Sequence, residues 1–112
     1  MKDKNGIANL SKNLQLKLKA FDTTNKKNFK ISEYFSWQEF TELFCNTTLI
    51  FPLKYKSIDF ELINNGKDCI ITIDYHNSKN DLIFSYSSAN DLLNNAAIEN
   101  KKLKEIWNEV IV

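Results

Sequence analysis

The side chains with the most reactive chemistry in this 112-residue chain are one histidine and two cysteines. His76 lies between Asp74 and Ser78 in a polar stretch, and Cys45 is a possible thiol partner, because a cysteine nucleophile needs an adjacent base. No sequence signature accompanies this combination, and a histidine in a polar loop beside an aspartate is usually solvated. We therefore predict that the protein is not an enzyme.

Metal and cofactor sites are not expected either. A zinc site needs three or four closely spaced ligands, whereas Cys45 and Cys69 are far apart in the sequence and form no CxxC pair. The two glycines, Gly6 and Gly66, stand alone, so no glycine-rich phosphate loop is present. The sequence predicts two free, structural thiols, no metal and no cofactor.

Charged side chains are the remaining candidates, and the two signs are separated along the chain. Residues 1–30 hold eight lysines and two aspartates (net +6), whereas residues 31–100 hold four lysines and ten acidic residues (net −6). The acidic residues that we expect to meet a cationic protein partner are Asp59, Glu61, Asp74 and Asp81. Solvated side chains on a sheet are the plainer explanation for the same residues.

The amino-terminal lysines suggest a different ligand, the phosphates of a nucleic acid. They are Lys12, Lys17, Lys19, Lys26, Lys27 and Lys30. Docking of this basic arm on the acidic body is the plainer alternative. All fifteen basic residues are lysine, so the bidentate fork of arginine is missing, and we expect such binding to be weak and non-specific.

Apolar spacing predicts the elements that must position these groups. Large apolar residues between 7 and 21 recur at helical intervals with only Leu16 off the stripe, although a strand over residues 13–21 is the alternative. A polar loop follows. Ser36 and Glu39 have the spacing of a capping box, which predicts a helix over residues 37–46, and we expect Pro52 to mark the break before a sheet.

The sheet itself is predicted from the pair Asn65-Gly66, which favours a type I′ turn between two alternating apolar runs. A two-residue loop would pair Leu62 with Cys69, Phe60 with Ile71, and Ile58 with Ile73. A third strand over residues 82–86 would pair Tyr75 with Leu82, Ile73 with Phe84, and Ile71 with Tyr86. The opposite face would carry Ser57, Asp59, Glu61, Thr72, Asp74 and Ser85.

Two helices should close the chain. Ser88 with Asp91 can open one of them, and the other holds Leu103, Ile106, Trp107 and Val110 at helical spacing. The predicted fold is therefore α+β: a three-stranded antiparallel meander covered on one face by helices. We predict a single domain, with a basic helical arm (residues 1–30) and an acidic α-β-β-β-α-α body (residues 31–112).

The tail DLLNNAAIENKKLKEIWNEV resembles the end of small proteins of low-GC bacteria and their prophages, which read roughly ELLENAxIDGKSLKEIWDEI. The resemblance covers about residues 55–112, including the NGK turn. It departs from the pattern at Glu99, Asn100 and Lys101, where the usual Asp-Gly-Lys turn has lost its glycine, so we expect this junction to be built differently. The resemblance implies a fold and a bacterial or phage origin, and no activity.

The function predicted from these observations is protein binding by a cytoplasmic protein of a phage or mobile element. No apolar run reaches the ~20 residues of a membrane helix, and the first residues lack a secretory signal. The partner could be a host defence nuclease, as for anti-CRISPR inhibitors, or a toxin, as for immunity proteins. Weak nucleic-acid binding and a structural homo-oligomer, paired through an edge strand or the first helix, are the alternatives.

Overall fold

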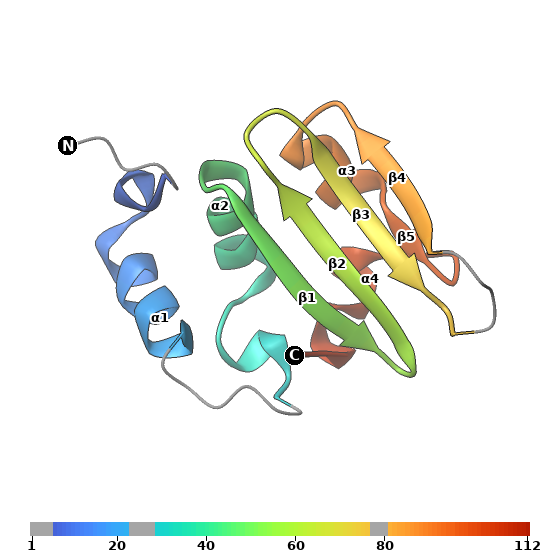
Figure 1. Ribbon diagram of the computed structural model, residues 1–112. Coiled ribbons are helices and arrows are strands. Elements are labelled where there is room, and N and C mark those ends of the chain that lie inside the picture. Colours follow the sequence, from blue (N-terminus) through green and yellow to red (C-terminus); the bar gives the residue numbers. More distant parts are fainter. Residues whose placement is uncertain (1–5, 23–28, 77–80) are drawn as a thin grey trace.

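The computed structural model describes residues 6–22, 29–76 and 81–112, and Figure 1 shows their arrangement. The helical elements are η1 (Ile7–Asn9), α1 (Lys12–Asp22), η2 (Ile31–Glu33), α2 (Trp37–Asn46), α3 (Ala89–Asn95), α4 (Leu103–Ile106) and η3 (Trp107–Glu109). The strands are β1 (Leu49–Tyr55), β2 (Ile58–Asn64), β3 (Cys69–Asp74), β4 (Leu82–Tyr86), β5 (Ala97–Ile98), β6 (Lys101–Lys102) and β7 (Val110–Ile111).

The main sheet is antiparallel and has the strand order β4-β3-β2-β1-β7. The α+β class is therefore correct, but the prediction of three strands is wrong, since β1 and β7 extend the sheet to five. Pro52 was expected to break the chain and instead lies inside β1, opposite Glu61 of β2. A proline fits there because the backbone N of residue 52 points away from β2. On that side β7 pairs only with Lys54 and Tyr55, so no hydrogen bond from residue 52 is needed.

Both predicted registers are wrong by two residues. In the structure Leu62 pairs with Ile71 and Phe60 with Ile73, while Ile71 pairs with Phe84. The first shift arises in the turn, where the Asn65 side chain accepts hydrogen bonds from the N–H groups of Lys67 and Asp68 at 2.9 and 2.6 Å, so the loop reaches Asp68. A shift of two residues keeps every side chain on its face, so the predicted apolar face is correct.

Turn geometry explains why the type I′ prediction fails. Gly66 has a φ of 86°, whereas neither Asn65 nor Lys67 has a positive φ. The positive-φ pair instead occurs later, at Glu99 (φ 52°) and Asn100 (φ 65°), in the connection between β5 and β6. This connection is thus a small hairpin made with two non-glycine residues in the left-handed region.

Helices α2, α3 and α4 cover one face of the sheet, as predicted (Figure 1). The Ser36–Glu39 capping box opens α2 at the predicted residue, and the Ser88 hydroxyl accepts the Asp91 N–H at the start of α3. The last helix is shorter than predicted, because Val110 leaves it and enters β7. Its neighbour Trp107 is buried and donates its indole N–H to the Phe35 carbonyl at 3.0 Å.

The amino-terminal segment packs beside α2 and β1. The predicted helix over residues 7–21 is interrupted after η1 and resumes as α1. Its apolar stripe still faces the core: Leu10, Leu14 and Phe21 are buried, Ile7 and Leu18 are partly buried, and Leu16 is 64% exposed. Lys17 forms a 2.7 Å ion pair with Glu39 of α2, and the Ser11 N–H donates to Glu42 at 2.9 Å. Most of the predicted loop after α1 lies outside the described residues.

Candidate functional site

The second face of the sheet is the strongest candidate for a binding surface, because no described element covers it (Figure 1). Side chains on this outer face alternate with those that enter the core. One row across three strands consists of Ile50, Ile63 and Ile70, which are directly paired in the two ladders. Ile50 is 63% exposed, and Ile83 on β4 is 65% exposed. Four isoleucines on a solvent-facing sheet are unusual, since such faces normally alternate apolar-in and polar-out.

Beside these isoleucines lie the four carboxylates that the sequence analysis singled out. Asp59 pairs directly with Asp74, and Glu61 pairs with Thr72. Together with Asp81, which precedes β4, they line one shallow hollow of about 260 Å³. The structure therefore brings all four predicted acidic residues to one place.

The carboxylates are partly neutralised within the surface. The Asp59 carboxylate lies 3.6 Å from the Lys54 ammonium and 2.6 Å from Nε2 of His76. Nδ1 of His76 lies 3.3 Å from one carboxylate oxygen of Asp74. The other oxygen of Asp74 accepts a hydrogen bond from the backbone N–H of His76 at 2.8 Å. Glu61 and Asp81 add further negative charge to the same hollow. Lys54 therefore offsets part of the negative charge of the Asp59–Asp74 pair, and the surface as a whole stays acidic.

Asp59, Asp74 and His76 are also close enough to share a cation, because their ligand atoms lie within 4.8 Å of one another. Both ring nitrogens of His76 already face carboxylates, however. The three side chains therefore contact one another on the acidic surface.

The catalytic alternative finds no common site. Cys45 belongs to α2 on the covered side of the sheet, where its thiol lies 3.4 Å from the Asn90 amide oxygen, whereas His76 lies on the outer face. Burial raises the pKa of the Cys45 thiol, which disfavours the reactive thiolate. Both cysteines are free thiols, as predicted. Ser78 lies outside the described residues.

The predicted nucleic-acid contacts do not form one described patch. Lys17 is engaged by Glu39, and Lys12 and Lys19 are exposed on α1. Lys30 bridges to Ile111 through its backbone. Lys26 and Lys27 lie outside the described residues. Part of the basic arm is therefore bound to the acidic body, which was the plainer of the two expectations.

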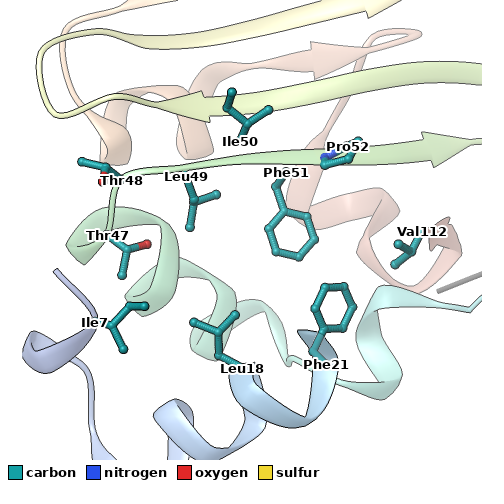
Figure 2. A pocket seen from close by; sticks show the side chains of 10 residues that line it. All are labelled: Ile7, Leu18, Phe21, Thr47, Thr48, Leu49, Ile50, Phe51, Pro52 and Val112. Carbon is teal, nitrogen blue, oxygen red and sulfur yellow. The ribbon is translucent and has the colours of Figure 1, made fainter. Parts of the chain in front are cut away.

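An apolar pocket of about 250 Å³ separates α1 from β1 (Figure 2). Phe21 of α1 and Phe51 of β1 stack across it with ring centroids 5.4 Å apart. Thr47 and Thr48 supply the only polar side chains of its lining, and the Thr47 hydroxyl already donates to the Leu43 carbonyl at 2.6 Å. None of the side chains that line the pocket is charged, so apart from the two threonines it offers only apolar contact.

Sequence reasoning missed the isoleucines of the outer face. Ile63 follows Leu62 and Ile70 precedes Ile71, so each stands in an apolar pair whose members point to opposite faces. Ile50 was missed because Pro52 was expected to mark the break before the sheet, so no strand was predicted around it. The alternation of Phe51, Leu53 and Tyr55 with exposed neighbours was the available signal.

Comparison with known proteins adds no identity: no family model, no curated protein and no solved structure matches the chain significantly. Within the described residues, no helix is long and apolar enough to cross a membrane. The case for function therefore rests on the surface itself.

Proposed function

We propose that this protein acts by binding another protein through the outer face of its sheet. The observation that carries the proposal is the juxtaposition of an apolar row, Ile50, Ile63 and Ile70, with the carboxylates that surround Asp59. Ile50 is exposed and Ile63 and Ile70 are partly exposed. Neighbouring accessible apolar side chains bordered by charge are typical of protein interfaces, whose desolvated centre provides affinity while the polar rim provides selectivity.

Charge defines the partner's chemistry. A partner that complements this face presents apolar side chains next to lysines or arginines, so that opposite potentials meet. Grooves that bind nucleic acid are cationic, and an acidic sheet is a suitable mimic of their ligand. Inhibition of a defence nuclease, or neutralisation of a nuclease toxin by an immunity protein, is the activity that fits best.

The test is to capture the partner and measure its affinity for three variants of the chain. Ile63→Thr combined with Ile70→Thr removes the apolar row and keeps β-branched residues in the strands. Asp59→Asn combined with Asp74→Asn removes two charges with little change of shape. Leu16→Gln, at an exposed apolar residue of α1, is the matched control.

We expect the isoleucine variant to lose at least tenfold in affinity, because its complex forms more slowly and dissociates faster. Leu16→Gln should bind like the wild type. The aspartate variant should mainly lower the association rate and reduce its dependence on salt. Equal affinity of the isoleucine variant and the control would show that the outer face is not the binding surface.

A further inference from the structure

The two edges of the sheet differ in a way that points to a second contact. At the β1 edge, Pro52 removes a backbone donor, β7 covers Lys54 and Tyr55, and α1 lies alongside (Figures 1 and 2). At the other edge β4 pairs only with β3 among the described residues, and no proline or charge interrupts it from Leu82 to Tyr86. Natural sheets usually protect an edge by one of these devices, because an open edge recruits another strand.

The side chains of β4 strengthen this difference. Leu82, Ile83 and Phe84 are 45%, 65% and 46% exposed, so the strand presents apolar surface on both of its faces. The ladder also leaves backbone groups free. Bonded pairs alternate along antiparallel strands, and counting from the Asn65 N–H bond to Asp68 makes Ile71–Phe84 a bonded pair. Ile83 therefore directs its N–H and C=O to the open edge, as does Ser85.

We infer that β4 pairs with β4 of a second copy of this chain, antiparallel and centred on Phe84. In that register Ile83 faces Ser85 of the other copy, and the two pairs related by symmetry exchange four backbone hydrogen bonds. Phe84 meets its own counterpart, and Leu82 meets Tyr86. The result is a continuous sheet of two copies.

Charge favours a second copy as the occupant. No charged residue lies between Asp81 and Asp91, so two β4 strands approach without like-charge contacts. The antiparallel direction places the two Asp81 residues at opposite ends of the paired strands. A segment of another protein would need equally uncharged, apolar residues over the same length.

The apolar area that β4 can bury indicates how stable this dimer is. Together Leu82, Ile83 and Phe84 expose about as much surface as one and a half fully exposed large side chains. That is roughly 250–350 Å² of apolar surface per copy. Stable complexes bury about 800 Å² per partner. A dimer with so small an interface should therefore be weak and reversible.

Sedimentation equilibrium of the full chain from about 5 µM to about 1 mM tests the inference. We expect the mass to rise from 13.1 kDa toward twice that value. Ser85→Pro removes an N–H at the open edge without touching the bonds to β3, as Pro52 does in β1, and should stay monomeric. Leu16→Gln changes a residue that is as exposed as Ile83 but lies on α1, and it should dimerise like the wild type.

Amide hydrogen exchange supplies a second readout that locates the contact. Protection of the Ile83 and Ser85 amides should increase with protein concentration, whereas that of other exposed amides should not. If Ser85→Pro is poorly folded, Ile83→Lys is the alternative variant and should also remain monomeric. A wild-type monomer at the highest concentration, or a dimer that forms without protection of these amides, would overturn the inference.

Discussion

Asn64 is the polar side chain on which the central hairpin most depends, and its replacement by aspartate gives a sharp test of the structure. Asn64 is 8% exposed, and its amide bridges two backbones. Nδ2 donates to the carbonyl of Phe44 at the end of α2 at 2.8 Å, while Oδ1 accepts the Gly66 N–H at 3.0 Å. Asn64→Asp keeps the volume and the acceptor but removes the donor.

The expected cost follows from the group left without a partner. The Phe44 carbonyl becomes unsatisfied in a buried position, which costs about 1–3 kcal/mol. A carboxylate oxygen would also stand against that carbonyl oxygen, so we expect about 2–3 kcal/mol of destabilisation at pH 7. For a chain of this size that corresponds to a thermal midpoint about 10 °C lower.

The loss should reverse in acid. Once protonated, the carboxyl introduced by Asn64→Asp can again donate to Phe44, so the folded state raises the pKa of this carboxyl above its unfolded value of about 3.9. An acid with a raised folded pKa destabilises the protein above that pKa, and the effect disappears as the pH falls below the unfolded value. The free-energy gap between variant and wild type should therefore shrink between about pH 6 and pH 3.

Urea unfolding of both proteins, followed by tryptophan fluorescence at several pH values, measures this gap. Asn65→Asp is the matched control, because Asn65 is exposed and its Oδ1 only accepts hydrogen bonds, from Lys67 and Asp68. A carboxylate can accept both, so the control should change stability by less than about 1 kcal/mol. Equal stability of the two variants at pH 7, or a gap independent of pH, would refute the reasoning.

Three further predictions concern other parts of the chain. Gly6→Ala should loosen the amino-terminal segment, because φ is 76° and a Cβ would overlap the Asn46 carbonyl oxygen; hydrogen exchange in α1 should accelerate, and unchanged exchange would contradict this. Hydrogen bonding to Lys17 lowers the pKa of Glu39 from its usual value, so this pair stabilises the fold at neutral pH and is lost as the pH falls through that lowered pKa. Glu39→Gln should flatten the fall of the thermal midpoint between about pH 5 and pH 2, and an unaltered slope would count against the pair. Cys45, whose pKa is raised by burial, should react with a thiol reagent at about pH 8 more slowly than in urea, and equal rates would show that it is accessible.

Two features of the fold could be predicted from sequence: which strand residues share a face, since they alternate, and where a locally capped helix begins. Ser36 and Glu39 determine the start of α2 because both capping bonds are local. The apolar face of the hairpin was predicted correctly although its register was not, since a shift of two residues leaves Phe60 and Ile71 on the same side. The true register depends on a side-chain bond from Asn65, which turn statistics do not reveal.

The missing strands depend on contacts between distant residues. β7 has two residues, too few for any periodic pattern, and exists because Lys54 and Tyr55 offer it an edge. Pro52 argued against a strand at β1, because a proline is excluded from the centre of a sheet. It is tolerated here because β7 does not pair with β1 at Pro52. The carboxylates of the candidate surface were predicted together by alternation, whereas its isoleucines depend on knowing that β1 belongs to the sheet.

β7 has a consequence for how the chain reaches its folded state. It pairs with β1 on one side and, through Ile111, with Lys30 on the other, while the Val112 N–H donates to the Phe29 carbonyl at 2.8 Å. These partners are synthesised long before the residues that join them. A growing chain therefore carries an unpaired β1 edge until its last described residues emerge, and those contacts of large sequence separation are expected to form late.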